Sequence, residues 1–543
     1  MTSQSVTDVA FDPVRSAPNP VDTDYEVGQD NIRFAGFDIH NPVFLISSLT
    51  AILFVFVTTL YPSQAEPLFG AVRDWITTHL DWLLLSTGNI IVLFCLAVIL
   101  LPVGRIRLGG KDAVPDFSYS TWFAMLFAAG MGIGLMFYGV SEPIGHYSAA
   151  VAADAGTVDS WAPLAGASGD VAAARDLGMA ATIFHWGLHP WAIYGVVALT
   201  LALFSYNKGL PLTLRSAFYP ILGERIWGWP GHLIDTLAVF ATLFGLATSL
   251  GLGASQALAG LNYLFGVPLT LTAKIGLIAG ITGIALISVV AGLDKGVRRL
   301  SEVNMALAAL LLLFVIVAGP TLAILSGFFG NLAAYGENLL PLSNPFGRED
   351  DNFRGGWTAF YWAWWISWSP FVGTFIARVS RGRTVREFMI AVLIVPSLVS
   401  VLWMTAFGGT AVSQLVETGF DGVVGADLPV KLYVMLEQLP LSSITSLIAV
   451  VLVIVFFVTS SDSGSLVIDT ITAGGKVDAP IPQRVFWASF EGLVAIALLL
   501  GGGLVALQAA AIATGLPFAV VLLVICVGTA MGLRDELRDK PRL

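Results

Sequence analysis

Long apolar blocks separated by short polar connections dominate this chain from about residue 43 to residue 532. Each block, at about 20 residues, is long enough to cross the roughly 30 Å of hydrocarbon in a bilayer. Because a backbone in lipid must satisfy its own hydrogen bonds, the blocks predict transmembrane helices. The pattern therefore predicts an all-α polytopic membrane protein with twelve spans, at about 43–61, 82–102, 119–141, 179–205, 232–260, 269–292, 303–329, 357–379, 388–412, 444–468, 485–503 and 505–532.

Composition supports this interpretation. Hydrophobic residues make up 56% of the 543 positions and charged residues only 12%, with a mean hydropathy of +0.80. That balance leaves no room for a large soluble domain, and the basic residues form no cluster that would indicate a nucleic-acid partner. Cys95 and Cys526 are the only cysteines and fall inside apolar runs. We therefore expect two buried thiols rather than a disulfide framework.

The basic residues also predict an orientation. Placing both termini in the cytoplasm puts 21 of the 27 Lys and Arg residues on the inner side, as the positive-inside rule requires. We therefore expect a multi-pass protein of the bacterial inner (cytoplasmic) membrane. Residues 1–40 are polar and acidic, which predicts a flexible cytoplasmic tail rather than a cleaved signal peptide. Residues 330–345 are too short and polar to cross and predict an interfacial helix.

Three glycines mark the third predicted span, where Gly130, Gly132 and Gly134 lie within the stretch 128–139. Close helix packing is one interpretation, but it would need only the first and third of them. The other is that glycine lets the helix unwind in mid-membrane, which frees carbonyls to bind a cation or a substrate. Such a break is tolerated only beside a cavity, so we expect this segment to face a substrate path.

Aromatic side chains form helical stripes in the eighth and fourth predicted spans. The eighth span carries Tyr361, Trp364, Trp368, Phe371 and Phe375 at intervals of three or four residues, with Trp365 about 60° off the stripe. The fourth span carries Trp186, Trp191 and Tyr194 on a similarly narrow arc. These tryptophans lie nearer the middle of their spans than an interfacial belt requires. Several π faces can enclose a bulky, weakly hydrated cation, so the stripes predict a quaternary-ammonium cage, with aromatic packing as the alternative.

The tenth predicted span contains a hydroxyl-rich stretch from Thr459 to Ser463. Hydroxyls and freed carbonyls are the oxygen ligands that a hard cation such as Na⁺ prefers, although hydroxyls in membrane helices often bond back to their own helix. Together with the glycine break, the stretch predicts an ion site.

His185 and His189 lie four residues apart on one helix, but the sequence places no carboxylate beside them. We therefore expect hydrogen-bonded packing residues. The sequence shows neither an embedded nucleophile–base pair nor a cluster of metal-ligand spacing, so no catalytic residue is assigned and a membrane enzyme is a distant alternative.

Four segments carry a resemblance: AAGMGIGLMFYGVSEP (128–143), HWGLHPWAIY (185–194), YWAWWISWSPFVGTFIARVSRGR (361–383) and FFVTSSDSG (456–464). With them the chain resembles the betaine/choline/carnitine transporter family across all predicted spans. The resemblance implies a LeuT-like core of two inverted five-helix repeats preceded by two helices, assembled as a homotrimer in membrane lipid. The implied division of the chain is a tail (1–40), two helices (41–110), a first repeat (111–343), a second repeat (344–533) and a short cytoplasmic tail (534–543).

The resemblance also implies site residues. The implied substrate site comprises Trp186, Trp191, Tyr194 and Trp365, a lining by Trp364 and Trp368, and the glycine segment at Met131, Gly132 and Gly134. The implied main sodium site comprises carbonyls of Ala128, Met131 and Phe456 and hydroxyls of Thr459 and Ser460. A second sodium position would fall on Thr242 and Phe371, although Leu246 stands where the family has a further threonine.

The neutral Gly134 separates subgroups of that family. Proton-coupled choline carriers place an aspartate there, so glycine favours a zwitterion that brings its own carboxylate. Sodium-independent exchangers replace the ion with an arginine of the fifth span, and residues 232–260 contain no Arg or Lys. The implied function is Na⁺ symport, by alternating access, of an osmoprotectant such as glycine betaine or a sulfonium analogue, without a cofactor besides Na⁺. A carnitine/betaine-type exchanger and proton-coupled choline uptake are the alternatives.

Overall fold

The computed structural model describes residues 17–538 except 19, 154–159 and 292–293. Within these residues nearly all regular structure is helical. Strands β1 (Asn31–Phe34) and β2 (Phe37–His40) form one antiparallel hairpin close to the N-terminus. Cys95 and Cys526 are both buried, as the sequence predicts.

Ten helical stretches among the described residues are long and apolar enough to cross a membrane. They are α1 (Asn41–Leu60), α3 (Asp81–Leu100), the continuous stretch Val171–Asn207, α9 (Trp229–Phe265), α10 (Leu271–Val290), α11 (Asp294–Ala318), α15 (Val385–Thr418), α18 (Ser442–Thr472), α19 (Ile481–Leu500) and α20 (Gly503–Arg538). The pair α4 (Tyr119–Gly130) and α5 (Ile133–Ala152) makes an eleventh if these two helices, bent by 63°, are one span. The chain is thus a polytopic membrane protein.

The predicted eighth span is α14 (Ala359–Val379), which is long enough to cross but is not among the apolar stretches. Tryptophan and tyrosine lower its hydropathy because each carries a polar ring atom. Every residue from Thr358 to Ser367 is nevertheless buried. All twelve predicted runs coincide with helical structure, and the number of spans stays a prediction.

One predicted span end is wrong. α11 ends at Ala318, because Gly319 and Pro320 interrupt the helix. α12 (Thr321–Ser343) then contains both the predicted end of the seventh span and most of the predicted interfacial segment. At the other end of the chain, residues 534–538 of the predicted cytoplasmic tail continue α20.

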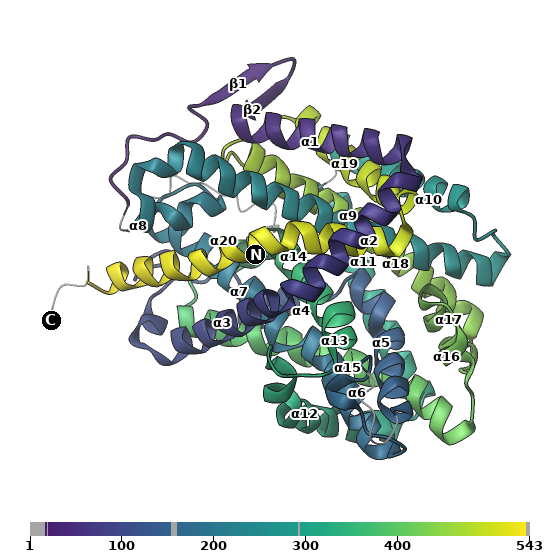
Figure 1. Ribbon diagram of the computed structural model, residues 1–543. Helices are drawn as coiled ribbons and strands as arrows, with labels where there is room; N and C mark the ends of the chain where they lie inside the picture. The colour runs from purple at the N-terminus through teal and green to yellow at the C-terminus, as the bar shows by residue number, and fades with distance from the viewer. Residues whose placement is uncertain (1–16, 19, 154–159, 292–293, 539–543) are drawn as a thin grey trace.

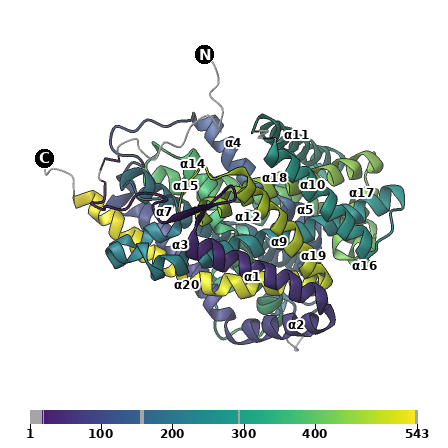
Figure 2. The ribbon, with the colours of Figure 1, turned by 90° about the horizontal axis from the view of Figure 1, so that it is seen from above.

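Short helices connect the long ones: α2 (Pro62–His79), α8 (Tyr219–Leu222), α13 (Asp351–Phe353), α16 (Gly422–Gly425) and α17 (Lys431–Glu437). Figure 1 places α16 and α17 on the opposite side of the molecule from the C-terminal end of α20. The view from above in Figure 2 shows the same separation. We call the side with the end of α20 the terminal side and the other the far side.

α14 lies at the centre of the helical core. It packs against α7 (Leu188–Ala202), α9 and α20, while α9 also packs against α18 and α15 against α5. Trp362 and Trp364 on α14 are only 0% and 1% exposed. The aromatic helix is therefore shielded by its neighbours, which places its rings among protein side chains.

Residues 20–40, here called the N-terminal strap, cross the terminal side (Figure 1). The Val21 amide donates to the Lys208 carbonyl at 3.0 Å, and Lys476 Nζ lies 2.5 Å from Asp38 Oδ2. Burial raises the pKa of Asp38, but hydrogen bonds from Lys476 and Asn31 outweigh it and bring that pKa below its ordinary value. Residues 31–40 thus form a hairpin that is bonded to the helical core, and they are not part of a flexible tail. Residues 1–16 of the predicted tail lie outside the described residues.

Candidate functional site

The third predicted span is broken where its glycines stand. α4 ends at Gly130, Met131 and Gly132 are extended, and α5 begins at Ile133 after a 63° bend. No side chain caps the first turn of α5. The first N–H groups of α5 and the last carbonyls of α4 therefore lie at the break without partners inside their own helices. Such an arrangement offers a positive helix end and a negative helix end within one segment.

A cavity of about 50 Å³ lies beside this break. All nine residues that the sequence assigns to substrate binding line it: Met131, Gly132, Gly134, Trp186, Trp191, Tyr194, Trp364, Trp365 and Trp368. The lining also includes residues that the sequence did not single out, among them Pro190, Val372 and Ser400. The structure therefore brings the two aromatic stripes and the glycine break to one place.

Helix geometry explains how the fourth span supplies three aromatic rings to this cavity. α6 (Val171–Trp186) is followed by Gly187, and α7 starts at Leu188 with Pro190 in its first turn. Trp186 therefore ends one helix while Trp191 and Tyr194 lie near the start of the next. A Cβ at Gly187 would lie 2.8 Å from the Ile183 carbonyl oxygen, so the kink requires glycine.

The aromatic rings contact one another mainly edge to face. Trp186 and Trp365 have ring centroids 4.9 Å apart at 71°, and Trp191 and Tyr194 are 5.3 Å apart at 78°. Trp364 and Trp365 instead stack at 4.7 Å and 15°. Perpendicular neighbours present faces in several directions, which is the geometry of a cage.

Four indole N–H groups at the cavity, among them that of Trp186, are bonded to the surrounding scaffold. Trp364 donates to Ser249 Oγ at 3.0 Å, Trp365 to the His185 carbonyl at 2.8 Å and Trp368 to the Gly245 carbonyl at 2.9 Å. Because these polar atoms are already satisfied, the rings offer the cavity their π faces.

Glu142, a fully buried carboxylate on α5, lies behind the cage. Its Oε2 accepts hydrogen bonds from Trp186 Nε1 at 2.7 Å and from the Tyr361 hydroxyl at 2.6 Å. Its Oε1 lies 2.5 Å from His185 Nδ1 and 3.1 Å from His146 Nε2. The expectation that no carboxylate accompanies His185 is therefore wrong, because the fold brings one from another helix.

The other histidine of that pair behaves as predicted. His189 Nε2 lies 3.0 Å from Asn89 Oδ1, and its ring packs against Phe184 and Trp362. It is a hydrogen-bonded packing residue.

Glu142, His146 and His185 also bring three ligand atoms within 4.8 Å of one another, a combination that a metal ion could use. This cluster escapes a reading of the sequence because Glu142 and His185 lie 43 residues apart and on different helices. An apolar stretch that contains a carboxylate two turns beyond a glycine break could have revealed it.

A partly exposed stripe on α14 leads from the cavity to the terminal side. It consists of Trp368, Phe371, Phe375 and Arg378, at intervals of three, four and three residues. Further towards the far side, Tyr361 is 0% exposed. These four are the partly exposed residues of α14, whose residues before Trp368 are all buried.

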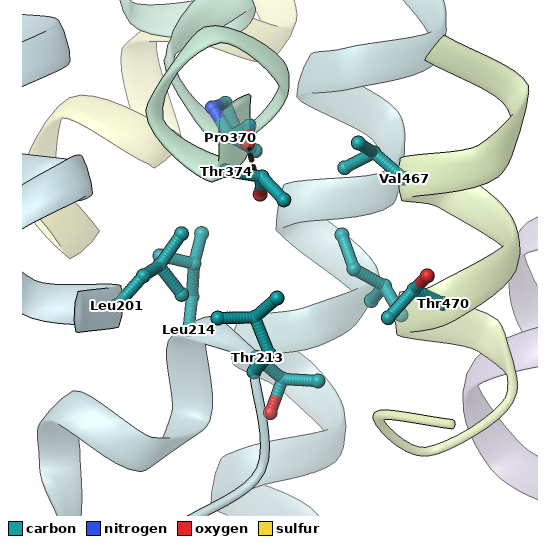
Figure 3. Close-up of a pocket in the computed structure, with 9 residues that line it drawn as sticks. Leu201, Thr213, Leu214, Pro370, Thr374, Val467 and Thr470 are labelled. Atoms are coloured by element: carbon teal, nitrogen blue, oxygen red, sulfur yellow. Dashed lines mark hydrogen bonds between the residues drawn. The ribbon is translucent and has the colours of Figure 1, made fainter. Parts of the chain in front are cut away.

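A second cavity, of about 10 Å³, is lined in part by the same half of α14. Figure 3 shows Pro370 and Thr374 of α14 facing Leu201, Leu214 and Val467 across it. The Thr374 hydroxyl donates to the Pro370 carbonyl at 2.7 Å. This volume accommodates about one water molecule, so we assign no ligand to it.

The predicted sodium ligands lie on two elements. Ala128 and Met131 flank the end of α4, while Phe456, Thr459 and Ser460 lie on α18, which packs against α5 and α14. The Thr459 hydroxyl donates to the carbonyls of Val455 and Phe456 at 3.0 and 3.3 Å. Its oxygen lone pairs remain acceptors, and both hydroxyl residues are partly exposed. The assignment of these five residues stays a prediction.

The predicted second sodium position is less complete. Thr242 is buried and its hydroxyl donates to the Ala238 carbonyl at 2.7 Å, while Phe371 is partly exposed on the α14 stripe. Leu246 packs against Gly464 of α18, where an apolar side chain supplies no ion ligand. This position also stays a prediction.

Comparisons with known proteins give one family. The family model for betaine/carnitine/choline transporters matches residues 42–538. A glycine betaine/proline/choline transporter of Vibrio parahaemolyticus is 63% identical over 527 residues, which cover 96% of this chain and 95% of the relative. Glycine betaine transporter 1 of the same organism is 56% identical and covers 95% and 97% of the two chains. A glycine betaine transporter of Bacillus subtilis is 41% identical and covers 89% and 93%.

Proposed function

Because this chain belongs to the betaine/carnitine/choline family of transporters, we propose that it imports a quaternary-ammonium zwitterion of the glycine betaine type together with Na⁺. Its family and its relatives make it a betaine-type transporter and not an enzyme. The membrane-enzyme alternative is thereby excluded. The cargo, the coupling ion and the transport cycle are the parts that we propose.

The single observation that carries the cargo assignment is the cage. Trp186, Trp191, Tyr194 and Trp365 surround one cavity, and the N–H groups of Trp186 and Trp365 are bonded to the scaffold. A trimethylammonium group cannot donate a hydrogen bond but binds π faces, each worth about 1–2 kcal/mol when desolvated. A sulfonium group would be recognised in the same way.

The α5 end of the break favours a zwitterion over a simple cation. Uncapped N–H groups at Ile133 and Gly134 lie at the cavity, where the positive end of the helix dipole attracts a carboxylate. A betaine has its onium and its carboxylate a few ångströms apart. It could therefore place one on the aromatic rings and the other at the start of α5.

Sodium coupling is supported by two features. Carbonyls at the end of α4 and hydroxyls of Thr459 and Ser460 on α18 are oxygen ligands suited to Na⁺. α9, the fifth predicted span, contains neither Arg nor Lys, so it offers no fixed cation to replace the ion.

Helix contacts support the two-repeat architecture. Exchanging the predicted repeats maps the packing of α7 against α14 onto that of α15 against α5, and the packing of α10 against α18 onto that of α19 against α9. Each member of these pairs is present. We propose on this basis a LeuT-like core that works by alternating access, with the terminal side cytoplasmic and three copies forming the membrane assembly.

The direct test is uptake of labelled glycine betaine into proteoliposomes with and without an inward Na⁺ gradient. The proposal expects accumulation that depends on the gradient and that is absent when K⁺ replaces Na⁺. Uptake that ignores the gradient would replace symport by exchange or uniport. A thermal-shift series with betaine, proline betaine, ectoine, carnitine, choline and dimethylsulfoniopropionate would rank the cargo.

Choline is the most informative compound in that series. It carries the onium group without a carboxylate, and the name of one relative includes choline. Tighter binding of choline than of betaine would favour the choline-uptake alternative and would reduce the weight of the α5 end.

A further inference from the structure

The buried side chain of Glu142 makes four hydrogen-bond contacts with other side chains. Two donors reach Oε2, from Trp186 and Tyr361, and two histidine nitrogens reach Oε1, from His185 and His146. These partners come from α5, α6 and α14, so one carboxyl group joins the broken span to both aromatic helices.

The partners indicate a carboxylate rather than a carboxylic acid at Oε2. An indole N–H can only donate, and Trp186 and Tyr361 both approach this oxygen within 2.7 Å. An ionised carboxylate accepts at both oxygens and can satisfy four donors, and such charge-assisted bonds are short and strong. His185 is held on its other side by Thr358, whose Oγ1 lies 2.9 Å from Nε2.

Trp186 connects this carboxylate to the cavity. Its Nε1 is bonded to Glu142, and the opposite edge of the same ring reaches Gly134, where an added Cβ would lie 2.7 Å from Cη2. Gly134, Tyr138 and Glu142 lie four residues apart on one face of α5, and the Tyr138 ring is 6.2 Å from that of Trp186. The side chain of Glu142 therefore acts on the cage through Trp186.

We propose that Glu142 is a positioning residue that orients Trp186 and supplies the cage with negative charge, and that this charge sets the preference between cationic and zwitterionic onium cargo. The inference rests on the proposed function in taking an onium compound as the ligand. It adds a determinant of specificity that lies outside the cavity lining.

Two physical effects support this role. A carboxylate that accepts the indole N–H withdraws positive character from the ring edge and leaves the π face more negative. The charge itself, in surroundings of low polarity, attracts a cation across several ångströms. Choline, with a net charge of +1, gains more from this charge than betaine, whose two charges largely cancel.

Glu142→Gln tests charge separately from shape. The amide oxygen of Gln can still accept from Trp186 and Tyr361, while its NH₂ can donate to a neutral imidazole of His185. Binding of choline and of betaine to the purified protein in Na⁺ is measured by titration calorimetry, alongside thermal unfolding. We expect the choline Kd to rise on the order of tenfold, the betaine Kd to rise less, and the choline-to-betaine preference to fall.

Glu491→Gln is the matched control. Glu491 also carries a fully buried carboxyl group, but its Oε2 accepts from Ser461 on α18 and it lies on α19, which contributes nothing to the cavity lining. The proposal expects the choline-to-betaine preference to stay unchanged in this variant. A preference that shifts equally in both variants would overturn it.

A purely structural role would move stability or both affinities by one factor. An unchanged choline-to-betaine preference in Glu142→Gln therefore contradicts the proposal. If that variant does not fold, Glu142→Asp keeps the charge but retracts it from Trp186. It should weaken both ligands while it keeps the wild-type preference, and unchanged affinities would overturn the proposal.

Metal analysis distinguishes the positioning role from a metal site. Ligand binding to the wild-type protein distinguishes it from a failure of the proposed function. Stoichiometric divalent metal retained through purification, found by elemental analysis and lost in His146→Ala, would make the cluster a metal site and overturn the positioning role. A wild-type protein that binds no onium compound would refute the proposed function itself. Betaine binding without any choline binding would refute only the charge role of Glu142.

Discussion

The aromatic wall of the cavity and the hydroxyl face of α18 differ in the atoms that their side-chain hydrogen bonds leave available. In the wall, formed by Trp186, Trp364 and Trp365, the polar N–H atoms are turned into the scaffold and the apolar faces are left over. On α18, the Thr459 hydroxyl donates its hydrogen bond to the Val455 carbonyl of its own helix, so its oxygen lone pairs remain acceptors. In the proposed function, the first region suits an onium cation that sheds water easily, and the second suits a cation that prefers oxygen ligands.

In the proposed function, this difference would let one core distinguish two cations. An onium group would meet π faces and sodium would meet oxygen atoms, in addition to the difference in size between the two. A substitution in the aromatic wall should therefore weaken binding of the onium cargo and leave sodium binding unchanged. A substitution in the hydroxyl face of α18 should do the reverse. The following variants examine that separation.

Trp365→Leu should give the largest effect, because Trp365 contacts both Trp186 and Trp364. Loss of one π face and its packing should weaken betaine binding on the order of thirtyfold, with little change in the sodium concentration needed for half-maximal binding. Titration of both ligands on purified protein measures it. Trp487→Leu removes an equally buried tryptophan, bonded to Thr472, and should lower stability alone. Normal transport by Trp365→Leu would make the cage assignment wrong.

Thr459→Ala combined with Ser460→Ala should damage the other region. Without the two hydroxyl ligands, the apparent sodium affinity should fall about tenfold, while betaine affinity at saturating sodium stays near the wild-type value. Sodium titrations of betaine uptake give both quantities. Ser461→Ala is the matched control, because this neighbouring hydroxyl donates to Glu491 on α19. Equal losses in the double variant and in the control would remove the sodium assignment from α18.

Gly134→Ala should give the smallest effect and affect the wall alone. The added Cβ would lie 2.7 Å from Trp186 Cη2 and 3.0 Å from Trp364 Cη2, so both rings must shift. We expect betaine affinity to fall about fivefold, in keeping with the cost of modest overpacking. Calorimetry on the variant checks this. Gly145→Ala, on the same helix but with nothing within 4 Å of its Cβ, should bind as the wild type does.

The aromatic stripes could be predicted from the sequence, because aromatic identity and helical spacing are local properties. Trp364, Trp365 and Trp368 are close in the chain, and the position of any two helical residues follows from the turn of the helix. The resemblance implied nine substrate residues, and the structure brings all nine to one cavity. Their role in substrate binding stays a prediction. Helix breaks were foreseen equally well where glycine marks them, at Gly132.

Long-range pairing was not predictable in this way. Glu142 meets His185 and Tyr361, which lie 43 and 219 residues further along the chain. The apolar pattern also misjudged one helix end. It extended the seventh span across Gly319 and Pro320, because the residues beyond them are apolar.

The burial of both cysteines has a practical consequence for following the transport cycle. Cys95 is 0% exposed and Cys526 6% exposed, so neither offers an accessible thiol to an aqueous probe. A spectroscopic reporter attached to a newly introduced, exposed cysteine would therefore report on that position alone. Pairs of nitroxide labels could then measure how far α4 and α18 separate when sodium and cargo are added. The two native cysteines would not have to be replaced first.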